Sequence, residues 1–333
     1  MSSGHKAGMI MKTRQLGKDG PMLTEIGLGA WAIGGSWTWG WGPQDDAESV
    51  RTIRTALDAG INWVDTAAIY GLGHGEEVVG TAIRERRREV FLATKCGLRW
   101  DDQKRVTNNL HPASIRKECE NSLRRLQTDY IDLYQCHWPH KNVPVEESWG
   151  QMTRLQEEGK VRFIGVSNFE TDLLQRCQEI HPINSLQPPY SMINRKIEAE
   201  ILPWCRDNQV GVIAYSPMQT GLLTGKFTPG YLETLAEDDW RRTSRNKFFR
   251  EPLYPAVLTF VDLLRPLAQR YDKSLAHLAI AWTLMHPAAT AAIVGARTAE
   301  QAKANIGGAG WEIEPGDLEK IDQWYQELIA PLL

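Results

Sequence analysis

Four polar residues, Asp65, Tyr70, Lys95 and His137, follow short apolar runs of the chain and together offer the groups for a proton transfer. A tyrosine phenol has a pKa of about 10 in water and is a weak acid at neutral pH. A neighbouring lysine cation would lower the pKa of the tyrosine, and an aspartate would keep that lysine charged. A histidine would orient a carbonyl oxygen. This set suits the reduction of an aldehyde or ketone, with Tyr70 as proton donor and a cofactor as hydride source.

The elements that must position these residues alternate regularly along the chain. Short apolar segments predict strands at residues 26–29, 61–65, 90–94, 131–135, 163–166, 185–187, 211–215 and 291–294. Amphipathic periodicity predicts helices at residues 45–59, 76–87, 114–126, 145–158, 170–178, 197–208, 274–285 and 298–305. Eight successive βα units predict an α/β fold, a single closed (β/α)8 TIM barrel. The chemistry of such a barrel lies at the C-terminal ends of its strands, where the four polar residues would meet.

Three further segments complete the expected organisation. A turn signal between residues 12–16 and 23–26 predicts an N-terminal β-hairpin. Residues 227–255 predict a long irregular loop after strand seven, with arginines at 241, 242, 245 and 250. Residues 1–11 are expected to be a disordered leader, because they lack the apolar segment of a secretory signal. A length of 333 residues is compatible with two domains, but no linker divides residues 12–333, which we interpret as one barrel domain.

Composition excludes several classes of function. The net charge is −3, and the densest basic run, residues 84–88, ends a predicted helix, where cations complement the helix dipole. The sequence therefore predicts no nucleic-acid partner. No apolar run reaches the roughly 18 residues of a membrane span, so we expect no membrane partner. The five cysteines form no CxxC motif, which favours a reducing compartment and a cytoplasmic location.

Two motifs could be misread as binding sites. Residues 71–75 read Gly-Leu-Gly-His-Gly, but their spacing differs from a dinucleotide-binding fingerprint and the next strand ends in Lys95 rather than an acid. His137 and His140 have the spacing of a metal-binding pair, but Pro139 lies between them and a third ligand is not evident. We predict a tight loop at the first motif and no metal at the second.

At these residues the sequence resembles the aldo-keto reductases, most of all the bacterial general-stress reductases, which are related to potassium-channel β-subunits. The resemblance rests on residues 65–71, 93–95, 130–139, 165–169, 214–217 and 295–297, in this order. It implies a catalytic tetrad of Asp65, Tyr70, Lys95 and His137, with Tyr70 as general acid and base. It also implies NADP(H) bound without a Rossmann fold, so that residues 12–333 would be an NADP-dependent oxidoreductase domain.

The resemblance also implies the residues that would bind the cofactor. Ser167, Asn168 and Gln187 would hold the nicotinamide carboxamide, and Tyr215 would stack on its ring. Arg297 would meet the 2′-phosphate, which favours NADP over NAD. The other implied contacts lie along the dinucleotide, at Gly29, Trp31, Asp65, Ser216, Pro217, Met218, Gln219, Gly221, Leu222, Lys226, Gly295, Gln301 and Asn305. The chain departs from many relatives at Met218, where leucine is common, and at Ala304, where glutamate is common near the adenine.

The 13 tryptophans are an unusual number for this length, and six of them fall in expected strand-end segments, at positions 31, 37, 39, 41, 100 and 138. We predict a substrate pocket formed by Trp31, Tyr70, Trp100, His137 and Trp138. An aromatic pocket suits aromatic aldehydes and equally suits sugars or other alcohols, so the substrate and the direction of reaction stay open. We also expect NADPH to quench the tryptophan fluorescence.

Two alternatives to a reductase remain on the sequence alone. One is an NADP(H)-binding redox sensor or a protein like the channel β-subunits, with little turnover. The other is a lyase that forms a Schiff base at Lys95. The sequence does not decide between a monomer and a homo-oligomer.

Overall fold

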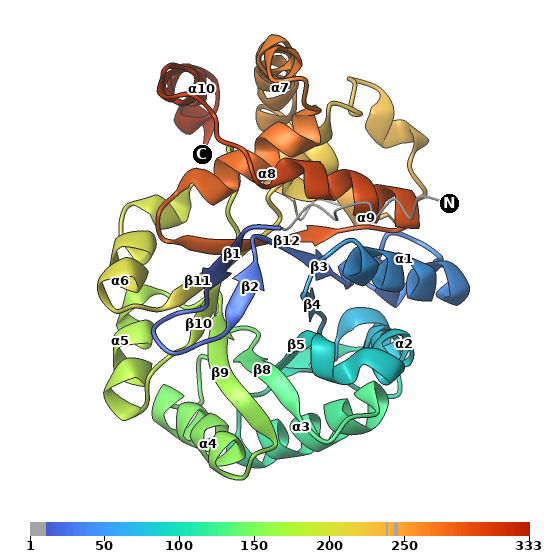
Figure 1. Cartoon of the computed structure of the whole chain (residues 1–333), viewed down its shortest axis with the longest axis vertical. Coiled ribbons are helices and arrows are strands. Elements are labelled where there is room, and N and C mark those ends of the chain that lie inside the picture. Colours follow the sequence, from blue (N-terminus) through green and yellow to red (C-terminus); the bar gives the residue numbers. More distant parts are fainter. Residues whose placement is uncertain (1–10, 238, 243–245) are drawn as a thin grey trace, which may run out of the picture.

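The structure is a computed structural model that describes residues 11–237, 239–242 and 246–333 (Figure 1). Eight parallel strands form a closed barrel in the order β3-β4-β5-β8-β9-β10-β11-β12. All eight predicted strands are present and lie in the predicted order. Their bounds are β3 (Ile26–Gly29), β4 (Trp63–Asp65), β5 (Phe91–Cys96), β8 (Ile131–Cys136), β9 (Val161–Ser167), β10 (Ser185–Gln187), β11 (Gly211–Tyr215) and β12 (Ala289–Gly295).

Helices surround the barrel and bury their apolar faces against its outer surface (Figure 1). Each predicted helix is present, although 3-10 turns replace the end of the second and the start of the sixth. The bounds are α1 (Asp46–Asp58), α2 (His74–Ile83), α3 (Pro112–Leu126), α4 (Val145–Glu157), α5 (Thr171–Ile180), α6 (Ile201–Asp207), α8 (Leu275–Met285) and α9 (Ala299–Asn305).

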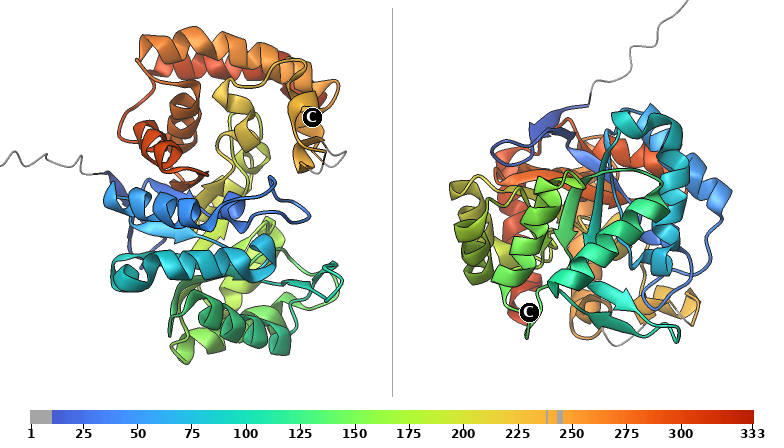
Figure 2. Two further views of the ribbon diagram at one scale, coloured as in Figure 1. Left: turned by 90° about the vertical axis from the view of Figure 1, so that its right-hand side faces the viewer. Right: turned by 90° about the horizontal axis from the view of Figure 1, so that it is seen from below.

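Two helices were not predicted, α7 (Leu253–Arg270) and α10 (Pro315–Leu328), which pack against each other outside the barrel (Figure 2). The interior of α7 contains Pro266, and a proline inside a helix disfavours it by about 3 kcal/mol. Buried apolar residues along one face, such as Phe260 and Leu264, offset this cost. Both helices lie outside the alternation of strand and helix, so the regular βα pattern does not predict them.

The predicted N-terminal hairpin consists of β1 (Thr13–Gln15) and β2 (Met22–Thr24), which pair antiparallel. Leu16 and Leu23 are fully buried and pack with the side chains that fill the barrel interior, among them Trp63. The indole Nε1 of Trp63 donates a hydrogen bond of 2.9 Å to the Thr24 carbonyl. The turn of the hairpin lies against the start of β10. At Gly17 (φ +62°) a Cβ atom would lie only 2.7 Å from the backbone oxygen of Asn184, the residue before β10. The hairpin therefore closes the N-terminal end of the barrel.

Loops at the C-terminal ends of the strands form the opposite face. A second hairpin, β6 (Leu98–Trp100) and β7 (Val106–Asn108), follows β5 and was not predicted. The predicted long loop after β11 is largely irregular, with short 3-10 segments, and it ends where α7 begins at Leu253. In this loop Arg241 forms an ion pair with Asp239, while Arg245 lies outside the described residues.

Candidate active site

The parallel strands bring the four predicted catalytic residues to one place. Asp65 is the last residue of β4, Lys95 lies near the end of β5, and His137 directly follows β8. Tyr70 begins the short 3-10 segment Tyr70–Gly73 after β4. All four side chains are buried. The predicted convergence at the C-terminal face of the barrel is therefore present.

Lys95 is the centre of the contacts between these residues. Its Nζ donates hydrogen bonds to Asp65 Oδ2 at 2.7 Å, to the Thr66 carbonyl at 2.9 Å and to Tyr70 Oη at 3.2 Å. The other carboxylate oxygen of Asp65 accepts a hydrogen bond of 2.8 Å from Gln187 Nε2. Burial raises the pKa of Asp65 and lowers the pKa of Lys95, while the attraction between their charges opposes both shifts. The geometry thus joins a buried ion pair directly to a phenol.

The expected lowering of the pKa of Tyr70 is wrong. Burial raises the pKa of Tyr70 well above 10, and the charge of Asp65 raises it further. The physical reason is that Asp65 balances the charge of Lys95, so that little remains to offset the loss of water around a phenolate. Tyr70 is therefore protonated at neutral pH and available as a proton donor.

His137 faces the same phenol. Its ring centroid lies 6.1 Å from that of Tyr70, with the two rings nearly perpendicular. Burial lowers the pKa of His137 well below 6.5, and the charge of Lys95 lowers it further. The imidazole is therefore neutral at pH 7 and has one nitrogen donor and one acceptor for a polar ligand.

The residues expected at the nicotinamide form a continuous hydrogen-bond chain. Ser167 Oγ donates to the Gln187 carbonyl at 2.7 Å, and Asn168 Nδ2 donates to Ser167 Oγ at 2.9 Å. Tyr215 Oη donates to Asn168 Oδ1 at 2.9 Å. Gln187 Nε2 already bonds to Asp65, but the side-chain oxygen of Gln187 has no partner among the described residues. That oxygen is an acceptor that a ligand amide group would fit.

The segment from Ser216 to Leu222, which includes Pro217 and Met218, has an unusual backbone conformation. Ser216, Gln219 and Thr220 have positive φ angles of 57°, 44° and 53°, as does Gly221 at 96°. Turn conformations can present backbone N–H groups to an anion, but those of Gln219 and Gly221 already donate to the Ser216 and Met218 carbonyls at 2.9 Å and 3.0 Å. The buried hydroxyl of Thr220 has no hydrogen-bond partner among the described residues, which points to an absent polar ligand. These features fit a bound pyrophosphate.

Four of the residues expected to contact the adenosine end of the cofactor form two hydrogen bonds with one another. Gln301 Oε1 accepts a hydrogen bond of 2.8 Å from the Arg297 backbone, and Asn305 Nδ2 donates to the Gly295 carbonyl at 3.1 Å. Gly295 pairs in register with Gly29 of β3, so the two expected contacts at Gly29 and Gly295 are neighbours. Lys226 is exposed, and no acidic side chain in the described part of the chain pairs with it.

Four of the six tryptophans in the predicted strand-end segments pack in one apolar cluster with Tyr70. The rings of Trp31 and Trp37 lie 5.4 Å and 6.0 Å from that of Tyr70, and Trp39 and Trp100 belong to the same apolar cluster. Trp100 comes from the hairpin that was not predicted, and the Arg125 guanidinium lies 5.7 Å from its ring. The predicted pocket residues Trp31, Tyr70 and Trp100 therefore lie together.

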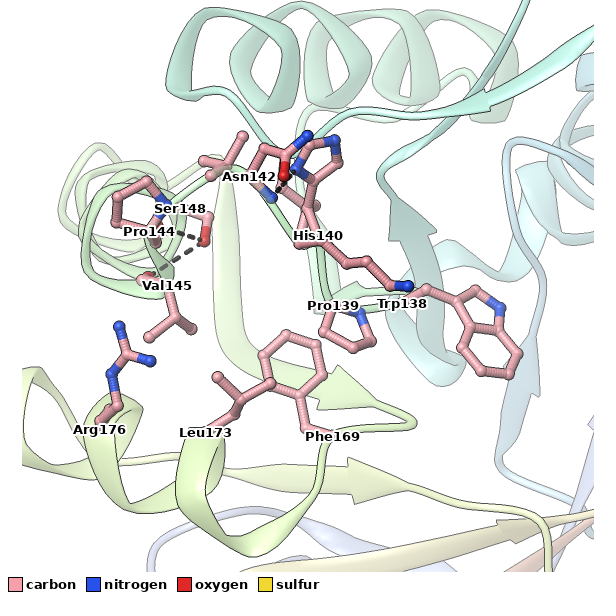
Figure 3. A pocket seen from close by; sticks show the side chains of 13 residues that line it. Trp138, Pro139, His140, Asn142, Pro144, Val145, Ser148, Phe169, Leu173 and Arg176 are labelled. Carbon is pink, nitrogen blue, oxygen red and sulfur yellow. Dashed lines mark hydrogen bonds between the residues drawn. The ribbon is translucent and has the colours of Figure 1, made fainter.

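Trp138, which was also predicted to line the pocket, is 44% exposed and lines a separate cavity of about 600 Å³ to which none of the four predicted catalytic residues contributes (Figure 3). This cavity lies between the loop after β8 and the start of α5, with Pro139, Phe169 and Leu173 on its walls. His140 also lines it, with its Nδ1 accepting a hydrogen bond from the Asn142 backbone. Within the described residues, groups of three or more metal-ligating side chains are absent.

Comparison with known proteins identifies the family of the chain. The model of the aldo/keto reductase family matches residues 25–326. The aldo-keto reductase YhdN of Bacillus subtilis is 41% identical over 96% of this chain and 95% of its own length. The NADH-specific methylglyoxal reductase of Escherichia coli is 36% identical, over 92% and 96%.

Two solved structures are also similar. The glycerol dehydrogenase AKR11B4 from Gluconobacter oxydans has a TM-score of 0.87 at 37% identity, covering 96% of this chain and 97% of that one. An aldo-keto reductase from Klebsiella pneumoniae in complex with NADPH has a TM-score of 0.72 at 29% identity, covering 95% and 96%.

The chain belongs to the aldo/keto reductase family. It is therefore an oxidoreductase of a family that uses a nicotinamide cofactor, and it has the barrel of that family. Across the described residues, no helix is long and apolar enough to cross a membrane.

Proposed function

We propose that this protein reduces small aldehydes and ketones with NADPH, or oxidises the corresponding alcohols or sugars, with residues 12–333 acting as one domain. The observation that supports this best is the buried contact of Lys95 with both Asp65 and Tyr70. A purely structural ion pair between Lys95 and Asp65 would not need a phenol 3.2 Å from the lysine Nζ. A phenol that donates a proton does need a neighbouring cation, because the cation stabilises the phenolate.

Each member of the tetrad has a distinct proposed role. The nicotinamide supplies the hydride to the carbonyl carbon when it is bound. Tyr70 donates its proton to the carbonyl oxygen, and Lys95 stabilises the phenolate that remains. Asp65 holds Lys95 in place. Neutral His137 donates a hydrogen bond that orients the carbonyl oxygen toward Tyr70.

The proposed cofactor contacts follow the expected set. Gln187, with Ser167 and Asn168, binds the carboxamide, and Tyr215 stacks on the nicotinamide. Residues 216–222 bind the pyrophosphate, and Arg297 binds the 2′-phosphate. The relatives differ in which nicotinamide cofactor they use, since one is NADH-specific and another is in complex with NADPH. Arg297 is the residue that favours NADPH here.

For the substrate we propose a small carbonyl compound or alcohol that fits beneath Trp31, Trp37 and Trp100. The names of two relatives, a glycerol dehydrogenase and a methylglyoxal reductase, support small polar substrates over large ones. Steady-state kcat/KM values over a panel of aromatic aldehydes, dicarbonyls and sugars would rank these classes.

The decisive experiment is the Tyr70→Phe variant. We expect kcat for carbonyl reduction to fall by about 10²- to 10⁴-fold, because the general acid is lost. NADPH binding, measured by quenching of tryptophan fluorescence, should be retained. Full activity of the variant would contradict the proposed mechanism.

Two other results would favour the alternatives. Tight NADPH binding by the wild-type protein without turnover of any carbonyl would favour a sensor or a protein like the channel β-subunits. Borohydride trapping of a substrate on Lys95 would favour the lyase.

A further inference from the structure

The guanidinium of Arg297, in the loop after β12, bonds to a segment that is more than 250 residues distant in sequence. Its Nε donates to Gln44 Oε1 at 2.8 Å, its Nη1 to the Trp41 carbonyl at 3.1 Å and its Nη2 to the Pro43 carbonyl at 2.6 Å. Gln44 Nε2 in turn donates to the Arg297 carbonyl at 2.9 Å. One side-chain amide thus holds both the side chain and the backbone of Arg297.

These contacts leave Arg297 able to bind an anion. A guanidinium has five N–H donors, and three of them are used here. All three acceptors are neutral, so no carboxylate among them balances the positive charge. The nearby acid Asp239 bonds to Arg241 through both carboxylate oxygens, at 2.9 Å and 2.5 Å.

The surroundings of Arg297 make its charge costly without a ligand. Burial lowers the pKa of Arg297, and the charge of Arg241 lowers it further. Arg297 and Arg241 therefore repel each other at the rim formed by the loops after β3, β11 and β12, where Asp239 forms its ion pair with Arg241. A phosphate monoester bound to the free N–H groups would relieve this repulsion.

We propose that Gln44 is a positioning residue that sets the preference for NADPH over NADH, by holding the Arg297 fork ready for the 2′-phosphate. This inference rests on the proposed function, in which Arg297 meets that phosphate. A flexible arginine loses side-chain entropy when it binds a phosphate, whereas one already fixed by neutral acceptors loses less. The amide of Gln44 provides this fixation without neutralising the charge.

The test compares four variants, Gln44→Ala, Arg297→Ala, the double variant, and Arg54→Ala as control. Arg54 is an exposed cation on helix α1, which follows the loop that holds Gln44. It bonds to the Ala82 carbonyl, so its removal lowers the positive charge without removing a contact of Arg297. The readouts are the dissociation constants of NADPH, NADH, adenosine 2′,5′-bisphosphate and AMP, measured by calorimetry or fluorescence titration.

We expect Arg297→Ala to weaken the two 2′-phosphorylated ligands by about tenfold or more, because hydrogen bonds to a charged group are lost. Gln44→Ala should weaken the same two ligands by about threefold to tenfold. NADH and AMP should bind both variants as they bind the wild type, which also shows that the variants are folded. The double variant should match Arg297→Ala, because Gln44 acts only through Arg297. Arg54→Ala should change none of these ratios.

Results of two kinds would overturn the inference, one from Gln44→Ala and one from Arg297→Ala. Equal losses for NADPH and NADH in Gln44→Ala would show a general structural role, and unchanged binding of both would show no role. If Arg297→Ala discriminates between the ligands and Gln44→Ala does not, only the role of Gln44 fails. If Arg297→Ala itself does not discriminate, the proposed NADPH preference fails and the inference fails with it.

Discussion

Lys95 and Arg297 are two cations on the same face of the barrel, and their surroundings differ in kind. Lys95 has a side chain with no exposure to solvent, and one of its three acceptors is a carboxylate. Arg297 is only partly buried, and its three side-chain acceptors are neutral carbonyl and amide oxygens. The first charge is balanced within the protein, and the second is not.

This difference indicates what each cation does. A buried charge must be paired, because an isolated ion in a medium of low polarity is expensive. A paired lysine can hold a phenol in place and stabilise the phenolate when the proton leaves. An unpaired arginine at a rim remains attractive to an anion that arrives from solvent. The predictions below test this contrast, beginning with the largest expected effect.

Replacing Lys95 with methionine should have the larger effect on both activity and folding. We expect carbonyl reduction to fall by about 10²-fold or more, because the phenolate loses its stabilising cation. The free energy of unfolding should fall by about 3–5 kcal/mol, because the buried Asp65 loses its cationic partner and keeps only the amide of Gln187. Urea unfolding and steady-state kinetics measure the two effects.

The double variant Asp65→Asn/Lys95→Met separates the effect on activity from the effect on stability. It should recover part of the stability, since no uncompensated charge remains, while activity stays low. If Lys95→Met alone unfolds at the wild-type urea concentration, the pair is not balanced in the way described.

Replacing Arg297 with alanine should change binding without a comparable change in folding. The free energy of unfolding should shift by no more than about 1 kcal/mol, since the lost partners are neutral groups on loops. NADPH should bind about tenfold more weakly while NADH binds as before. A loss of stability as large as that of Lys95→Met would erase the contrast between the two cations.

The smallest expected effect is a dependence of stability on pH through His137. Its pKa in the folded protein lies well below the ordinary 6.5, because of burial and then the charge of Lys95. Well above pH 6.5 both folded and unfolded states have a neutral imidazole, and His137 contributes no pH dependence. As the pH falls below 6.5, the unfolded state takes up a proton that the folded state does not bind, so the free energy of unfolding decreases.

Between pH 7.5 and 5.5 this contribution is about 1 kcal/mol, and His137→Asn should remove it. Urea titrations at both pH values measure the difference. His140→Asn, three residues further along the same loop, is the matched control and should keep the wild-type pH dependence. If His137→Asn also keeps it, the imidazole is not held neutral by its surroundings.

The barrel could be predicted from sequence because its strands are short apolar runs at regular intervals. β3, β10 and β11 have the predicted bounds. Asp65, Lys95 and His137 lie at the ends of β4, β5 and β8, and Tyr70 lies in the loop after β4. The convergence follows from topology, since parallel strands in a barrel end on one face. The roles of these residues come from the family resemblance and stay proposals.

The remainder depends on contacts between segments distant in sequence. α7 and α10 pack on each other, and the hairpin that holds Trp100 follows β5, where the βα pattern predicts a simple loop. The bond from Gln187 to Asp65 crosses from β10 to β4, so no local pattern reveals it. Gln44 is one glutamine in a loop and had no sequence signal. The pKa of Tyr70 was predicted in the wrong direction because the degree of burial was unknown.

The N-terminal hairpin determines from which end of the barrel substrate and product can reach Tyr70. Leu16 and Leu23 stop one end of the barrel, and packed side chains fill the interior above them. Any molecule that reaches Tyr70 must therefore enter and leave at the C-terminal face of the barrel. Substrate and product share this face, so a slowly departing alcohol product delays the entry of the next carbonyl substrate.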